Sequence, residues 1–188
     1  MTEAAMSSWW RTLADRFAGG ELPAGFPGAL SADEIVLGWA ELAEGGQLVA
    51  TSLGLWVPDG DSSRRVGWHL ISKATWRGDL LGVIEAEQTG TVEPVGGVVL
   101  LADRPVVRYR LARPGRLPDV VHARVTGSIK SSHHRDLPGG GAWFVQRRVP
   151  GQDGVVLQVR ADPGTEPAAV RSVASQVGQR IFRPDGEP

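Results

Sequence analysis

Between residues 33 and 112 the sequence alternates short apolar runs with turn residues, and this pattern constrains the fold more than any other feature. Gly45-Gly46, Gly78-Asp79 and Arg104-Pro105 are typical of the breaks between the runs. Parallel strands need long crossover connections, and these breaks are too short to supply them. The segment therefore predicts an antiparallel meander that closes into a small barrel or a bent sheet. The runs are QLVATS, LGLWV, RRVGWHL, KATW, LLGVIEAE, GGVVLLA and PVVRYRLA.

The hydrophobic period changes at Leu117, which indicates a helix over residues 117–130. Pro118 suits a first helical turn, and apolar residues recur every four positions. We expect this amphipathic helix to cap the barrel with one stripe buried in the core. The stripe consists of Val121, Val125 and Ile129.

The remaining sequence predicts an appended β-hairpin and a C-terminal helix. Strand-like runs cover residues 142–149 and 154–161, with Pro150-Gly151 between them. Thr165 is placed to cap the final helix, and Pro184 to end it. Its apolar stripe consists of Val170, Val173, Val177 and Ile181.

Residues 1–31 predict a short N-terminal helix and a linker rich in Pro and Gly. The helix, over residues 7–18, carries Trp9 and Trp10 on its apolar face, and we expect it to dock on the domain surface. Ser31 and Glu34 match a capping box, yet the alternation in the DEIVLGWAEL run that follows favours a strand.

The chain is expected to form a single β-rich α+β domain over residues 32–183. Within it, residues 32–131 make the barrel and its capping helix, and residues 132–183 make a ββα extension. Residues 184–188 are predicted to be a disordered tail.

Three motifs resemble a family of uncharacterised actinobacterial proteins: VLGWAELAEGGQLVATSLGLWV, RVGWHLISKATW and RYRLARPGRLPDVVHARVTGSI. The order of about seven antiparallel strands followed by a helix also resembles a pleckstrin-homology-like barrel, in which the terminal helix closes one open end. The resemblance covers roughly residues 33–182. It implies this fold, but no established activity and no functional residues.

The composition excludes several kinds of chemistry. The chain has no cysteine, so disulfides, thiolate metal ligands and thiol nucleophiles are absent. No G-x-S-x-G motif and no phosphate-binding glycine loop occur. The N-terminus lacks the features of a signal peptide, and no stretch has the length of a membrane span. We therefore expect a cytoplasmic protein with no membrane span, no cofactor, no metal and no catalytic residues.

Charge is distributed unevenly along the chain. Residues 1–90 carry 6 basic and 12 acidic residues, whereas residues 91–188 carry 14 and 9. Within the arginine-rich segment 104–148, residues 108–116 lead from the last predicted strand into the N-terminus of the predicted helix, where an anion is favoured. Its four candidate anion-binding residues are Arg108, Arg110, Arg113 and Arg116. The competing interpretation is that the acidic half of the chain neutralises them, and the pI near 6.4 argues against a nucleic-acid partner.

One local polar cluster could take part in ligand binding or proton transfer: His133, His134 and Asp136. Adjacent histidines in an extended segment point to opposite faces, so only His134 and Asp136 would share a side. We interpret the segment as a polar connector. Glu85 and Glu87 are expected to line the solvent face of their strand.

Tryptophans are numerous, and most of those in strand-like runs are expected to fill the core. These are Trp39, Trp56, Trp68, Trp76 and Trp143. With no assembled chemistry in view, the leading hypothesis is a non-enzymatic protein-interaction or scaffold module whose partner is another protein. The alternatives are a binder of phosphorylated ligands or anionic surfaces, and an enzyme whose site only the fold assembles.

Overall fold

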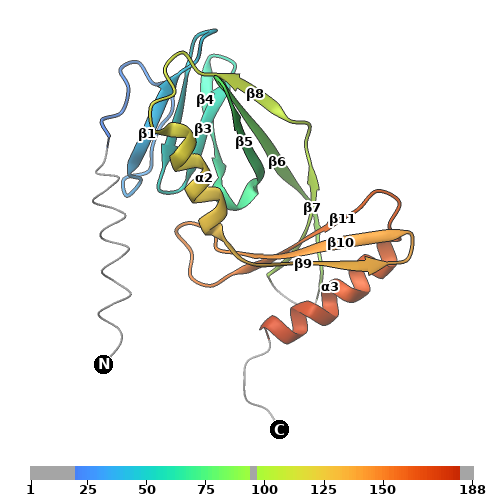
Figure 1. Cartoon of the computed structure of the whole chain (residues 1–188). Helices are drawn as coiled ribbons and strands as arrows, with labels where there is room; N and C mark the ends of the chain where they lie inside the picture. The colour runs from blue at the N-terminus through green and yellow to red at the C-terminus, as the bar shows by residue number, and fades with distance from the viewer. Residues whose placement is uncertain (1–19, 94–96, 183–188) are drawn as a thin grey trace, which may run out of the picture.

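The computed structural model of the chain describes residues 20–93 and 97–182. The helix predicted over residues 7–18 and the tail predicted from residue 184 lie outside the described residues. The described part is a strand-rich α+β fold with a curled half-barrel sheet and two α-helices (Figure 1). The β-rich small barrel or bent sheet with helices that the sequence predicts is therefore confirmed.

The first four strands form an antiparallel sheet of their own. β1 (Val36–Glu41), β2 (Gln47–Thr51), β3 (Gly54–Asp59) and β4 (Ser62–Gly67) lie side by side in chain order. The tight turn between β3 and β4 contains Gly60 at φ +59°, which a glycine adopts without strain. This half of the barrel is the meander that the short breaks in the sequence predict.

A second sheet is built around one long strand, β6 (Leu80–Thr91). A 3₁₀ turn, η1 (Trp68–Leu70), leads into β5 (Ile71–Arg77), which pairs with one edge of β6. The other edge of β6 pairs first with β8 (Val107–Arg110) and then with β7 (Val98–Asp103). All of these pairs are antiparallel, and β6 belongs to both halves of the molecule.

The two sheets enclose an apolar core, and α2 (Leu117–Ser128) covers it. The sheets meet along one seam, where the Ala43 N–H donates to the Arg110 carbonyl and the Ala112 N–H donates to the Glu41 carbonyl, each at 2.9 Å. The largest buried side chains of this core are Trp68, Leu48, Leu55, Ile71, Leu81 and Leu117.

The helix stripe expected from the sequence is correct for Val121 and Val125, which are buried, and wrong for Ile129. The Ser128 hydroxyl donates to the Val125 carbonyl, and the backbone becomes extended at Ile129. Ile129 therefore begins a strand, and its side chain is 37% exposed.

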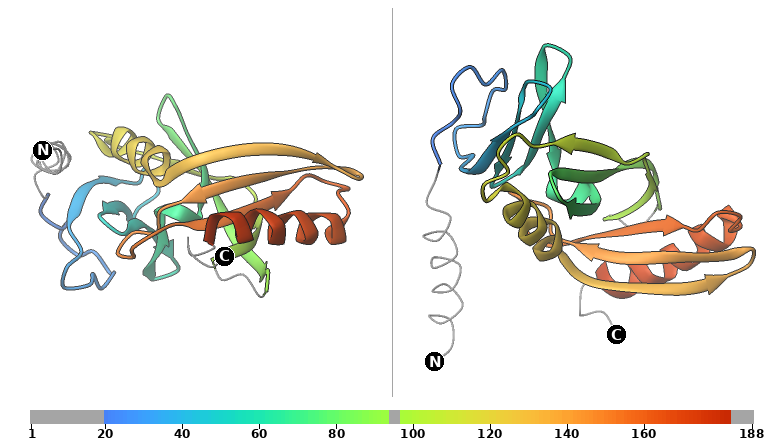
Figure 2. Two further views of the ribbon diagram at one scale, coloured as in Figure 1. Left: turned by 90° about the horizontal axis from the view of Figure 1, so that it is seen from below. Right: turned by 45° about the horizontal axis from the view of Figure 1, so that its top comes forward.

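The C-terminal part extends the second sheet. β9 (Ile129–Leu137), β10 (Gly140–Arg147) and β11 (Val156–Ala161) give the order β5-β6-β7-β11-β10-β9. β7 and β11 pair in parallel, whereas the other neighbours are antiparallel. α3 (Pro167–Phe182) packs against one face of this sheet (Figure 2).

Two details of the predicted ββα extension need correction. The hairpin β10–β11 and the final helix are present, but residues 129–137 form a third strand instead of a connector. Thr165 does not cap α3, because its hydroxyl bonds the backbone N–H and carbonyl of Gly141, at 3.0 and 2.8 Å. Gly139 forms the β9–β10 turn at φ +82°, and an added Cβ there would lie 2.3 Å from the Gly164 carbonyl oxygen.

A buried arginine joins the half-barrel to the extension. Arg147 of β10 is 1% exposed, and its Nη1 donates to the carbonyls of Trp68 and Ile71 and to the hydroxyl of Ser128, at 3.1, 2.9 and 3.0 Å. Burial, reinforced by the charge of Arg160, lowers the pKa of Arg147 to about 10. The guanidinium thus stays charged at neutral pH and ties η1 and β5 to α2 and β10.

Residues 21–34 fold over the outer face of the β1–β4 sheet. Phe26 and Leu30 pack there against Val36, Val49 and Trp56. The predicted strand begins after Glu34. The capping-box pair makes its hydrogen bond although no helix follows, because the Ser31 N–H donates to the Glu34 carboxylate at 3.2 Å.

Glu34 anchors this segment with a buried carboxylate. Its Oε1 accepts hydrogen bonds from the Thr51 hydroxyl at 2.5 Å and the Trp56 indole at 2.8 Å. Its Oε2 accepts one from Arg65 at 2.5 Å. Burial alone would raise the pKa of Glu34, but these bonds and the Ser31 N–H together hold it below its ordinary value.

This shift predicts a dependence of stability on pH. Because the folded-state pKa of Glu34 is lower than the unfolded one, its ionised form stabilises the fold above the ordinary carboxyl pKa of about 4.3. That stabilisation is lost as the pH falls below this value. Urea unfolding at a series of acid pH values should show a steeper loss for the wild type than for Glu34→Gln. Parallel curves for the two proteins would contradict this account.

Candidate interaction surface

Trp143 lies in the middle of β10 on the sheet face that α3 does not cover. Its neighbours in sequence, Ala142 and Phe144, are buried in the cluster beneath α3. Since side chains alternate along a strand, Trp143 points to the opposite face. Its side chain is 45% exposed there.

The indole of Trp143 is held by a neighbouring histidine. The rings of His134 and Trp143 meet edge to face with centroids 5.1 Å apart. His134 Nε2 lies 2.7 Å from a carboxylate oxygen of Asp162, and its Nδ1 lies 3.8 Å from Asp136. The contact with Asp162 fixes the imidazole, and the imidazole in turn limits the positions open to the indole.

The predicted polar cluster is thus only partly brought together. His134 pairs across the ladder with Trp143, and His133 pairs with Phe144, so the two histidines point to opposite faces as expected. Asp136 is on the same face as His134, and its side chain is 99% exposed. Asp162, which no sequence motif singles out, provides the closer carboxylate because β10 and β11 bring it beside β9.

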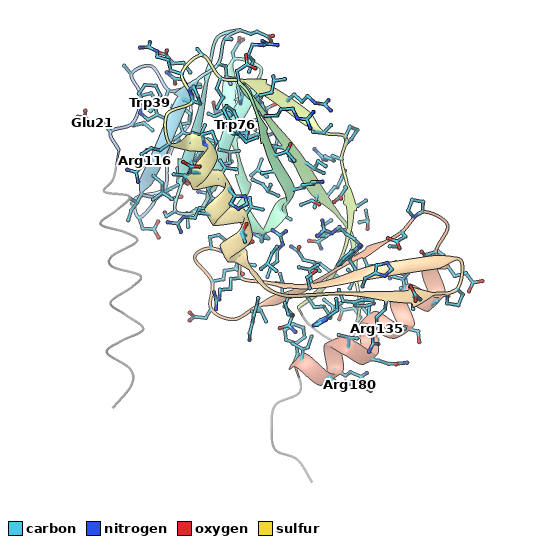
Figure 3. The ribbon with its side chains drawn as sticks, in the orientation of Figure 1. Glu21, Trp39, Trp76, Arg116, Arg135 and Arg180 are labelled. Atoms are coloured by element: carbon cyan, nitrogen blue, oxygen red, sulfur yellow. The ribbon has the colours of Figure 1, made fainter. Side chains whose placement is uncertain are left out.

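The expectation that most of the strand tryptophans are core residues is wrong, because only Trp56 and Trp68 of the five are buried. Trp39, Trp76 and Trp143 are 39%, 40% and 45% exposed. Trp39 and Trp76 belong to different parts of the half-barrel, as Figure 3 shows. For Trp143 a sequence signal existed, because the smaller and apolar neighbours Ala142 and Phe144 already fill the inward positions of the alternation.

Two of the four candidate anion-binding arginines pair with acidic side chains. Arg110 pairs with Asp79 at 2.9 Å, and Arg113 pairs with Glu41 at 3.1 Å. Both acids belong to the acidic N-terminal half of the chain, as the competing interpretation expected. Arg108 is exposed and has no side-chain partner among the described residues, and Arg116 occupies the N-cap position of α2.

The two strand carboxylates differ in environment. Glu85 is 7% exposed and receives two hydrogen bonds from Arg64, at 2.8 and 2.7 Å. The expectation that it lines the solvent face is therefore wrong. Glu87 is exposed, as expected, and pairs with Arg104 at 3.1 Å. These contacts give Glu85 a structural role in holding β4 against β6.

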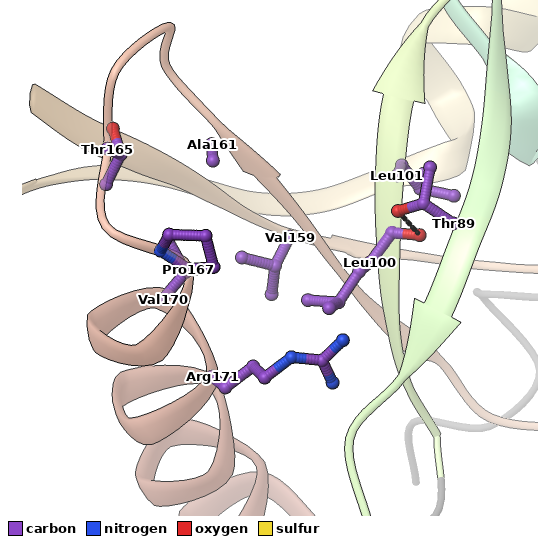
Figure 4. Close-up of a pocket in the computed structure, with 9 residues that line it drawn as sticks. All are labelled: Thr89, Leu100, Leu101, Val159, Ala161, Thr165, Pro167, Val170 and Arg171. Atoms are coloured by element: carbon purple, nitrogen blue, oxygen red, sulfur yellow. Dashed lines mark hydrogen bonds between the residues drawn. The ribbon is translucent and has the colours of Figure 1, made fainter.

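An open cavity of about 290 Å³ lies on the other face of the extension, between α3 and strands β6, β7 and β11 (Figure 4). Thr89 bonds the Leu100 carbonyl at one side, and Arg171 reaches across to the Thr91 carbonyl at 3.4 Å. The volume is at the small end of the range for ligand pockets. Its apolar lining comes from Leu100, Leu101, Val159, Ala161, Pro167 and Val170.

Comparison with known proteins gives no relative. No protein family, no curated protein and no solved structure matches the chain. Within residues 20–93 and 97–182, no helix is long and apolar enough to cross a membrane. The same residues contain no group of three His, Cys, Asp or Glu side chains arranged to hold a metal ion.

Proposed function

We propose that the chain is a protein-interaction module that binds a partner protein through the face of β10 that carries Trp143. The observation that carries this proposal is the exposed indole held in place by His134 and Asp162. Tryptophan is enriched among the residues that dominate binding energy at protein interfaces. A side chain already restricted in the free protein also loses less conformational entropy on binding.

The chemistry around Trp143 indicates what the partner presents. The indole offers an apolar surface, and the carboxylates of Asp162 and Asp136 lie on the same side of the sheet. A partner side chain with an apolar stem and a cationic head, above all arginine, can lie on the indole and reach a carboxylate. We infer a partner segment that contains arginine beside apolar residues.

The half-barrel itself is proposed to belong to the pleckstrin-homology-like class of folds. Support comes from the sheet β1–β4, the antiparallel strands β5, β6 and β8, and the helix α2 that follows and covers the core. This class hosts many interaction modules, but a fold alone does not specify a ligand. A cytoplasmic location remains part of the same proposal.

Binding of phosphorylated ligands is the second candidate, and Arg108 favours it. This guanidinium is exposed and unpaired in the described structure, whereas Arg110 and Arg113 would have to exchange Asp79 and Glu41 for a phosphate. Exposed ion pairs are weak, so such an exchange costs little. Binding of a phosphate by these arginines would weaken as the salt concentration rises, whereas binding through Trp143 would weaken less.

The test compares Trp143→Ala with Trp76→Ala, a matched control at a tryptophan of similar exposure. Each tagged protein is used to capture binding partners from a lysate of the cells in which the chain naturally occurs. A captured protein is then purified, and its affinity for each variant is measured by titration calorimetry. Trp143→Ala should weaken this binding at least tenfold, which corresponds to loss of ~1.4 kcal/mol or more at an interface residue. Trp76→Ala should leave it unchanged.

Thermal unfolding of both variants checks that each is folded. Binding that survives Trp143→Ala would contradict the proposal. A different result would instead favour the phosphorylated-ligand candidate: Arg108→Glu and added salt each abolish binding, and Trp143→Ala has no effect.

A further inference from the structure

β9 is a long strand with one unpaired edge. It extends from Ile129 to Leu137 and pairs with β10 alone among the described residues, at the end of the strand order. Figures 1 and 2 show it at the border of the extension, with α3 beneath the sheet and not beside this edge. Such an edge presents a row of free N–H and C=O groups that another strand can pair with.

The turn at Pro138-Gly139 determines which residues direct these groups outward. Leu137 and Gly140 face each other across this two-residue turn, so they form a hydrogen-bonded pair. Hydrogen-bonded pairs alternate along an antiparallel ladder. Between Ser131 and Leu137, odd-numbered residues of β9 therefore bond to β10, whereas Ser132, His134 and Asp136 direct their backbone groups to the free edge. At Lys130 the ladder has a bulge, and beyond it the Ser128 carbonyl accepts the next bond, from the Arg148 N–H.

The sequence of this edge, IKSSHHRDL, is complementary to itself in one antiparallel register. When His133 faces its own copy, Ser132 lies opposite His134, and both have outward backbone groups. In the same register Lys130 lies opposite Asp136. Each Lys130 thus meets an Asp136 of opposite charge, and every such pair occurs twice because the arrangement is two-fold symmetric.

We propose that two copies of this chain associate through β9, antiparallel and centred on His133, to form one continuous sheet across the dimer. Lys130 and Asp136 are suited to this contact because both side chains are exposed in the single chain. The charges of Lys130 and Asp136 disfavour pairing of β9 with most other strands, but in this register they attract each other.

Sedimentation equilibrium of the full chain, from low to high micromolar concentration, tests the proposal. The wild type should show a monomer–dimer equilibrium. Ser132→Pro should give a monomer, because proline removes an outward N–H that β10 does not use, and prolines are tolerated at such edge positions. Trp143→Ala should still dimerise, which separates this result from the proposed partner site.

Charge exchange tests the register. Lys130→Asp and Asp136→Lys should each raise the dimer dissociation constant about tenfold, because each places two pairs of like charges opposite each other. The double variant, which carries both substitutions, should recover wild-type association, since opposite charges then face each other again with their positions exchanged. Circular dichroism and thermal unfolding confirm that each variant is folded.

A wild type that remains monomeric throughout, a dimer that persists in Ser132→Pro, or a double variant that stays monomeric would each overturn the proposal. A glutamate-rich extended peptide serves as a competing probe of the same edge. Tight binding of this peptide to a monomeric wild type, strengthened by Asp136→Lys, would assign the edge to a different protein instead of a second copy.

Discussion

Glu34→Ala is expected to lower the free energy of unfolding by about 3–5 kcal/mol, the loss typical of removing one partner from a buried ion pair. The substitution leaves the Thr51 hydroxyl, the Trp56 indole N–H and the Arg65 guanidinium without the acceptor that they share. It also releases residues 21–34 from the outer face of the first sheet. Equilibrium denaturation with urea, followed by tryptophan fluorescence, measures the change.

Glu44→Ala provides the matched control for this experiment. Glu44 is exposed, and surface substitutions of this kind change stability by less than about 0.5 kcal/mol. If Glu34→Ala lost no more than Glu44→Ala, the hydrogen bonds to Glu34 would not anchor the segment.

Arg147→Ala should also lower the free energy of unfolding by about 3–5 kcal/mol. The variant removes three donated hydrogen bonds and leaves the carbonyls of Trp68 and Ile71 buried without these donors. It also creates a cavity where β10 meets η1 and α2. Arg147→Met preserves most of the volume and removes the buried charge, so it should cost less than the alanine variant.

The neighbouring residue Arg148 is exposed and makes Arg148→Ala a suitable control for loss of charge. Denaturant unfolding of the three variants gives the comparison. Equal stability of Arg147→Ala and Arg148→Ala would show that the junction does not depend on the buried guanidinium.

The sequence predicts those elements whose two faces differ in hydrophobicity. The strands of the half-barrel alternate, and α2 carries Pro118 and a buried stripe, so both are recognisable. β9 is not, because an edge strand exposed on most of its length has no apolar alternation. The stripe that includes Ile129 was misleading for a related reason: the spacing continues past Ser128, but the helix does not.

The burial of the charged residues Arg147 and Glu34 could not be predicted from the sequence. Arg147 contacts a carbonyl 79 residues away, and Glu34 contacts Arg65 31 residues away. Only the folded topology brings such groups together, so local spacing could not separate them from surface charges. The same is true of Asp162, which approaches His134 only after β9, β10 and β11 have paired.

The parallel pair β7–β11 has a consequence for how the chain folds. Val98 pairs with Leu157, and the residues between them include β8, α2, β9 and β10. Contacts between distant parts of a sequence close large loops, which slows folding. During synthesis, the edge of β7 therefore remains unpaired until residues 156–161 have left the ribosome. The half-barrel can assemble first, whereas the extension must await the synthesis of β11, and this interval is when the nascent chain is most exposed to aggregation.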